Sequence, residues 1–140
     1  MAIIGFNYSR MNVERKKPVK GKVNVSFNIV IDSVKKAKVN IGSSKRSGAE
    51  FKFKFKVLYE PDMAELVLEG TLVYIGEAKT VEKVIERWEK EKKITKDAFQ
   101  EVYNYILKKS NVQALILTKE MNLPAHFQMP KVNLKGEQKE

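Results

Sequence analysis

Few side chains in this sequence have the types and spacing that enzyme chemistry requires. The chain contains no cysteine and a single histidine, His126. A catalytic triad needs a histidine that is oriented by a carboxylate and placed against a nucleophile, whereas His126 lies between two prolines, with Ser110 as the nearest serine. The lack of cysteine also excludes disulfides, thiolate metal sites and cysteine nucleophiles. We therefore predict a protein that is not an enzyme, has no metal site and needs no cofactor, with an ordinary structural role for His126.

Two other patterns also have ordinary interpretations. The glutamates between positions 82 and 91 alternate with lysine and arginine, which is typical of a solvated, ion-paired helix face rather than a carboxylate metal site. Gly42 and Gly48 bracket a polar segment, but a phosphate-binding loop requires Gly-Lys-Ser/Thr followed by a helix. Here Ala49 and a strand pattern follow Gly48 instead. The segment 42–48 is therefore predicted to be a hairpin loop.

The positive charge of the chain is confined to its first 60 residues. Residues 1–60 contain 14 Lys/Arg and 4 Asp/Glu, whereas residues 61–140 contain 13 of each, so the first segment carries the whole formal charge of +10. Such an excess can neutralise phosphates, which makes nucleic-acid binding by the N-terminal half an alternative function. The candidate basic patch consists of Lys16, Lys17, Lys20, Lys22, Lys52, Lys54 and Lys56.

The composition of this patch also favours a simple solvated surface. Phe51, Phe53 and Phe55 alternate with the lysines at 52–56, so on a strand they face away from them and cannot stack bases on the basic side. Lysine outnumbers arginine 23 to 4, and arginine is the better reader of bases. A solvated sheet face in a Lys/Glu-rich protein is thus the other interpretation, and nucleic acid is the less favoured partner.

The elements that position these residues are predicted from hydrophobic periodicity. Apolar residues alternate with polar ones along 6–13, 23–31, 51–59 and 65–75, which indicates four strands. The turn at 60–62 contains Pro and Asp, and its short length favours antiparallel pairing of the third and fourth strands.

The second half of the chain has the periodicity of helices. From Thr80 onward, apolar residues recur at intervals of three and four, and a second helix is predicted over 95–120 with Thr95 as its N-cap. The segment 112–117 is apolar on more than one helical face and therefore needs burial on two sides. Either a second copy of the chain or the sheet and the C-terminal tail supplies the second side.

The predicted fold class is α+β, with a four-stranded antiparallel sheet followed by two helices, the second of them long, and an extended C-terminal tail. We expect residues 1–134 to form one domain and residues 135–140 to be disordered. No apolar run approaches the ~20 residues of a membrane-spanning helix, and the N-terminus does not have the features of a signal peptide. We therefore expect a cytoplasmic protein without membrane insertion.

Two short motifs resemble a known family. The first is Leu-Glu-Gly-Thr-Leu-Val-Tyr-Ile at 68–75 in the fourth strand, and the second is Leu-Pro-Ala-His-Phe-Gln-Met-Pro-Lys-Val-Asn-Leu at 123–134. The second motif is similar to the tail that follows the long helix of SecB-like chaperones, with one more residue between its second proline and the valine. The order of elements over residues 1–134 also resembles that family.

The resemblance implies an ATP-independent chaperone that holds unfolded or non-native polypeptides, works as a homo-oligomer (a tetramer or a dimer) and serves protein export or toxin–antitoxin control. Bacterial export members are acidic and thereby engage a SecA motor, whereas this chain is basic, so we do not expect engagement of such a motor. The resemblance places peptide-binding residues along the second helix and the tail. They are Tyr103, Ile106, Leu107, Met121, Leu123, Phe127 and Met129.

Overall fold

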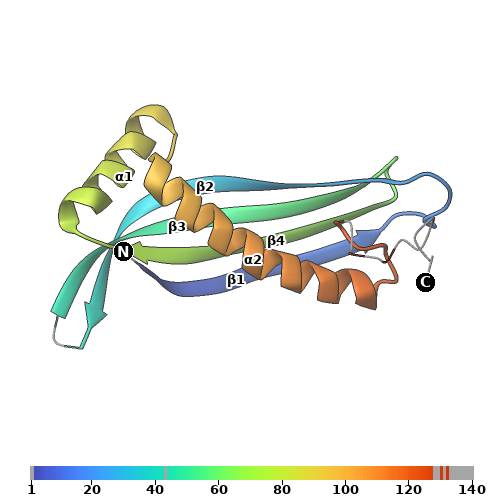
Figure 1. Ribbon diagram of the computed structural model, residues 1–140, viewed down its shortest axis with the longest axis horizontal. Helices are drawn as coiled ribbons and strands as arrows, with labels where there is room; N and C mark the ends of the chain where they lie inside the picture. The colour runs from blue at the N-terminus through green and yellow to red at the C-terminus, as the bar shows by residue number, and fades with distance from the viewer. Residues whose placement is uncertain (1, 43, 128–129, 131, 133–140) are drawn as a thin grey trace, which may run out of the picture.

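A sheet of four long strands carries two helices on one of its faces (Figure 1). The computed structural model describes residues 2–42, 44–127, 130 and 132. The elements are β1 (Ala2–Arg15), β2 (Asn24–Ile41), β3 (Ser44–Glu60), β4 (Ala64–Ile75), α1 (Ala78–Glu91) and α2 (Lys96–Glu120). The predicted α+β class and order of elements are confirmed. The predicted disordered segment, 135–140, lies outside the described residues.

The strands pair in the order β1-β4-β3-β2, and every neighbouring pair is antiparallel. β3 and β4 are joined by the predicted turn, where Asp62 adopts a left-handed conformation with φ of 46°. β1 and β2 are therefore the two edges of the sheet. This arrangement places the aromatic residues of β3 at the centre, where Phe51, Phe53 and Phe55 are fully buried.

β2 and β3 extend furthest beyond the strands that the sequence pattern predicts. β2 continues to Ile41 instead of ending at Ile31, because an irregularity in its pairing with β3 between Ile31 and Ser33 interrupts the alternation. β3 begins at Ser44, so the prediction of a loop over 42–48 is wrong for residues 44–48. Here the β2–β3 hairpin extends beyond β4 as a two-stranded ribbon, so polar residues are tolerated. A polar composition therefore does not distinguish a loop from a strand in this segment.

Gly70 marks a close approach of β1 to β4. A Cβ atom at this position would lie 2.3 Å from the carbonyl oxygen of Asn7 and 3.0 Å from the ring of Phe53. The register between β1 and β4 shifts nearby, between Tyr8 and Arg10. Only glycine therefore fits at this close approach of β1 to β4 without a backbone shift.

The core consists of two clusters that lie along the helix-covered face of the sheet. The first cluster combines Phe51 and Phe53 with α1 and the N-terminal half of α2. The second cluster surrounds Phe55 and Tyr59 and includes Ala114 of α2 and Leu123 of the tail. The long helix α2 therefore spans both clusters diagonally over the sheet (Figure 1).

Candidate functional site

The long helix α2 is buried along one narrow stripe. Its buried residues recur every four positions, which makes one line along a helix, and most are small. The residues of the stripe are Ala98, Val102, Ile106, Ser110, Ala114 and Thr118. Larger apolar residues off the stripe are left at the surface, with Phe99 beside it and Val112 and Ile116 on the opposite side of the helix. Phe99, Val112 and Ile116 are 46%, 59% and 49% exposed.

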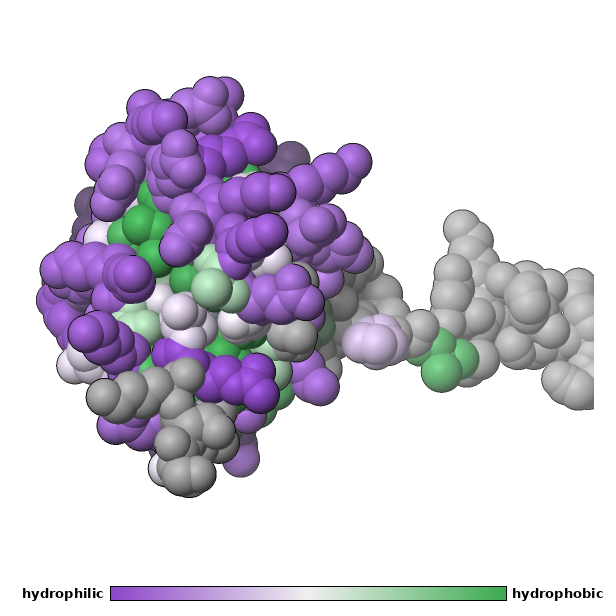
Figure 2. Space-filling model, turned by 90° about the vertical axis from the view of Figure 1, so that its left-hand side faces the viewer, coloured by the Kyte–Doolittle hydropathy of each residue, from purple (hydrophilic) through white to green (hydrophobic). Residues whose placement is uncertain are grey.

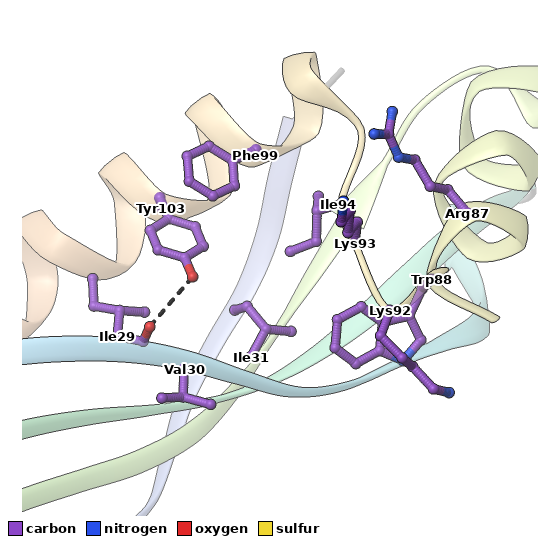
Figure 3. A pocket seen from close by; sticks show the side chains of 10 residues that line it. All are labelled: Ile29, Val30, Ile31, Arg87, Trp88, Lys92, Lys93, Ile94, Phe99 and Tyr103. Carbon is purple, nitrogen blue, oxygen red and sulfur yellow. Dashed lines mark hydrogen bonds between the residues drawn. The ribbon is translucent and has the colours of Figure 1, made fainter. Parts of the chain in front are cut away.

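A groove of about 450 Å³ opens on one side of this stripe, where β2, the end of α1 and the start of α2 meet (Figure 3). Edge strand β2 contributes one wall, and the α1–α2 connection and α2 contribute the others. The residues that line it are Ile29, Val30, Ile31, Arg87, Trp88, Lys92, Lys93, Ile94, Phe99 and Tyr103. We call this feature the corner groove.

Two stacked aromatic rings on α2 form the wall of the corner groove. Phe99 and Tyr103 lie one helical turn apart, with ring centroids separated by 4.2 Å and planes inclined by 21°. The Tyr103 hydroxyl donates a hydrogen bond of 3.3 Å to the carbonyl oxygen of Ile29 in the edge strand (Figure 3). Burial raises the pKa of Tyr103, so its hydroxyl stays protonated and able to donate near neutral pH.

Cations line the rim of the corner groove on its α1 side (Figure 3). α1 ends at Lys92, which adopts a left-handed conformation with φ of 55° and donates its backbone N–H to the carbonyl oxygen of Trp88. The Lys92 Nζ atom lies 5.7 Å from the centre of the Trp88 ring, within range of a cation–π interaction. Arg87 is paired with Glu91 at 3.2 Å. The groove thus has an apolar floor and a basic rim.

A second groove, of about 550 Å³, follows the opposite side of α2 next to edge strand β1. Its apolar surface comes from Phe6, Tyr105 and Val112, and the rings of Phe6 and Tyr105 are 5.5 Å apart. Lys108 and Lys109 also line it. The segment of α2 that is apolar on two faces is therefore covered by the sheet on one face and exposed on the other in a single chain.

The structure distributes the seven predicted peptide-binding residues over different environments. Tyr103 lines the corner groove. Leu107, one helical turn beyond Tyr103, and Met121, at the far end of α2, are half-buried and pack against the second core cluster. The prediction therefore groups residues of the second helix and the tail that the structure spreads along the length of α2.

The remaining predicted residues lie inside the protein or in the tail. Ile106 is fully buried in the first core cluster and Leu123 is 7% exposed in the second, so a bound polypeptide does not reach them in this conformation. Phe127 packs edge-on against His126, with ring centroids 4.8 Å apart. Met129 lies outside the described residues.

Sequence reasoning misses most of the corner groove. The local pattern places Ile29 on a half-buried strand and Trp88 on a narrow helical stripe, and nothing local connects these two positions. One signal is present: Phe99 and Tyr103 are aromatic residues at i and i+4, which places them side by side on a helix. How exposed these two rings are depends on the small residues of the buried stripe, which lie between α2 and the sheet. The sequence does not show this before the helix is docked.

His126 packs against α2 and against aromatic residues of the sheet. It is 2% exposed, and its Nε2 atom lies 2.7 Å from the Oδ1 atom of Asn111. Its ring packs edge-on against Phe27 and Phe55. Burial lowers the pKa of His126, which favours the neutral imidazole. The Tyr59 hydroxyl donates to the carbonyl oxygen of Pro124 and fixes the same segment to β3.

The predicted lysine stripe lies on the sheet face that the helices leave open, together with carboxylates from β4. Lys54 is in register with Glu69, and the Lys56 Nζ atom lies 3.8 Å from Glu65. Arg10 of β1 also pairs with Glu69, at 2.9 Å. The stripe at 52–56 is therefore partly neutralised by β4, which the linear sequence does not reveal.

The other predicted basic residues precede β2. Lys16 is paired with Asp62 at 3.0 Å and approaches Glu65 at 4.0 Å. Lys17, Lys20 and Lys22 are exposed in the connection between β1 and β2. The proposed basic patch is thus spread over the open sheet face and one end of the sheet instead of forming one cluster.

Two kinds of site are absent from the described part of the chain. No group of three or more His, Asp or Glu residues within it is arranged to hold a metal ion. None of its helices is both long enough and apolar enough to span a bilayer.

This sheet and these helices form a fold that is similar to one already seen in a solved structure. The chain superimposes on the solved structure of the Mycobacterium tuberculosis Rv1957 SecB-like chaperone in complex with a ChAD peptide from the Rv1956 HigA1 antitoxin. The TM-score is 0.58 at 11% sequence identity, over 94% of this chain and 90% of that chain. Neither a family model nor a curated protein matches the sequence. The likeness establishes the fold.

Proposed function

We propose that this protein is an ATP-independent, non-enzymatic chaperone that binds unfolded or non-native polypeptides. The observation that carries the proposal is the corner groove, in which Phe99 and Tyr103 of α2 face the edge strand across an apolar floor. Two features of the fold support it: the groove is open to the surface, and the SecB-like fold neighbour has a polypeptide ligand. Protein export and toxin–antitoxin control are the roles that the proposal includes.

The mechanism would be desolvation of apolar client side chains. Burying one large apolar side chain contributes about 1.5–3 kcal/mol, so one groove holds a client weakly and reversibly. Reversible binding suits a chaperone, because a client has to be released to fold or to be handed on. The predicted residues Leu107, Met121 and Phe127 would extend the binding surface along α2 toward the tail, while the basic rim would attract clients with acidic segments.

The test is the suppression of aggregation of a chemically denatured client. We expect the wild-type protein to suppress aggregation near stoichiometric ratios. Phe99→Ala should require about tenfold more protein, because removing the ring weakens client binding by roughly 1.4 kcal/mol. Met11→Ala is the matched control, since Met11 is 44% exposed, lies on β1 and does not line the corner groove. Absence of suppression by excess wild-type protein would contradict the proposal, as would equal effects of the two variants.

We also propose that the chain assembles into a homo-oligomer, a dimer or a tetramer, through the exposed face of α2. Val112 and Ile116 are large aliphatic residues at 59% and 49% exposure, one helical turn apart. Pairing of two such faces would supply the second side that this segment lacks in one chain. Light scattering of the wild type should give a multiple of 16.1 kDa, and Ile116→Asp should lower it. A strictly monomeric wild type would exclude this assembly.

A further inference from the structure

The free end of the β2–β3 hairpin is a second surface, separate from the corner groove. Pairing of β2 with β3 continues from Ala37 and Gly48 out to Ile41 and Ser44, whereas β3 pairs with β4 only as far as Gly48. The hairpin therefore leaves the sheet as a two-stranded ribbon about 15 Å long, at 3.4 Å per residue. Figure 1 shows this ribbon projecting past the N-terminus, at the same end of the sheet as α1. We call it the arm.

The arm and its base carry positive charge without carboxylates. Residues 33–49 contain five Lys/Arg and no Asp/Glu. Lys36, Lys38 and Arg46 are exposed. Lys38 is in register with Ser47 and Val39 with Arg46, so Lys38 and Arg46 project from opposite faces of the ribbon. Figure 2, which views this end of the molecule, shows a largely hydrophilic surface with small hydrophobic patches.

The lysine stripe on the sheet has carboxylates beside it, whereas the arm does not. Lys54 and Lys56 lie beside Glu69 and Glu65, which β4 brings to the same face. β4 does not reach the arm, because its pairing with β3 ends at Gly48. Like charges held on an isolated ribbon repel one another, and a two-stranded ribbon is only marginally stable by itself. An external polyanion would relieve this repulsion and stabilise the arm.

We propose that the arm binds the phosphate backbone of duplex nucleic acid. The major groove of a DNA duplex is about 12 Å wide and admits a two-stranded β-ribbon. Phosphates line both walls of such a groove, and the arm presents cations from both of its faces. An acidic polypeptide does not offer two opposed rows of anions at a fixed spacing. The duplex is therefore the ligand that this geometry fits best, and the contacts would be independent of sequence.

The experiment measures fluorescence anisotropy of a short labelled DNA duplex titrated with the full-length protein. The arm variant is Lys36→Gln/Lys38→Gln/Arg46→Gln, and the matched control is Lys52→Gln/Lys54→Gln/Lys56→Gln, which removes the same charge from the sheet face. We expect wild-type binding at about 50 mM salt that weakens steeply toward about 200 mM. In the arm variant, the slope of log K against log salt should fall by about 0.9 for each phosphate that is no longer neutralised. The control should retain most of the affinity and slope.

Three outcomes would overturn the proposal. They are no duplex binding at low salt, an equal or greater loss of binding in the sheet control, and competition by poly-glutamate that matches unlabelled duplex at equal charge. The last result would assign the arm to acidic polypeptides. Circular dichroism of both variants shows whether they fold. The arm variant should keep the wild-type suppression of client aggregation, which separates this site from the corner groove.

Discussion

The hydroxyl group of Tyr103 donates a hydrogen bond of 3.3 Å to the carbonyl oxygen of Ile29, 74 positions earlier in the chain. This bond joins the long helix to the edge strand of the sheet across the corner groove. It satisfies a backbone carbonyl group of an edge strand, where such groups are otherwise open to pairing with another chain. The separation of α2 from β2, and thereby the width of the corner groove, is set at this position.

Replacing Tyr103 with phenylalanine should therefore weaken the link between α2 and β2 but leave the aromatic wall of the corner groove in place. Tyr103→Phe removes the hydrogen bond but keeps the ring that stacks on Phe99, so we expect a loss of about 1 kcal/mol in the free energy of unfolding. Urea unfolding measures this loss. Tyr103→Ala should cost clearly more, because the packing of the ring is removed as well. Equal losses for the two variants would contradict a stabilising role for the stacked ring.

Gly70→Ala should destabilise the sheet strongly. The new Cβ atom would meet the carbonyl oxygen of Asn7 at 2.3 Å, so β1 has to move away from β4, at a cost of about 1–3 kcal/mol or more. Gly5→Ala is the control, because its Cβ atom would meet only Val73, at 3.9 Å. Thermal unfolding should show a large drop in Tm for the first variant and little change for the second. Similar Tm values would refute the close approach of β1.

Acidification should destabilise the tail through His126. Burial lowers the pKa of His126 in the folded protein, so between this value and the ordinary pKa of 6.5 the unfolded chain binds the proton more readily. The stabilising contribution is complete above pH 6.5 and is lost as the pH falls from there through the folded-state pKa. His126→Gln should remove this part of the pH dependence in urea unfolding. A wild-type profile in the variant would assign the dependence to other groups.

Alkaline pH should lower the stability of the protein through Tyr59, which also fixes the tail to the sheet. Burial raises the pKa of Tyr59 to about 12, above its ordinary value of 10.0. Between these values the unfolded chain loses its proton first, so stability falls as the pH rises above 10. Tyr59→Phe cannot ionise and should make this limb less steep, with Tyr103 still contributing to it, while it lowers stability at neutral pH by losing the bond to Pro124. An unchanged alkaline limb in the variant would contradict the assignment.

The sequence is sufficient for the elements and their order, because hydrophobic periodicity is a local property. The alternation at 51–59 marks a strand with one buried face, and Phe51, Phe53 and Phe55 are indeed fully buried. The position of Thr95 before α2 is also predicted, although its side chain makes no capping hydrogen bond. The pattern fails where its period changes: the pairing irregularity after Ile31 conceals the second half of β2, and with it the arm.

Only the tertiary structure decides where a ligand can bind. The corner groove joins Ile29 of β2 to Trp88 and Tyr103 of the helices, and strand order and helix docking bring these three together. Pairing of β3 with β4 sets Glu65 and Glu69 beside the lysine stripe but stops short of the arm. Charge in a sequence is counted along the chain, whereas its field depends on neighbours in space. The same excess of lysine is therefore partly compensated on the sheet and left uncompensated on the arm.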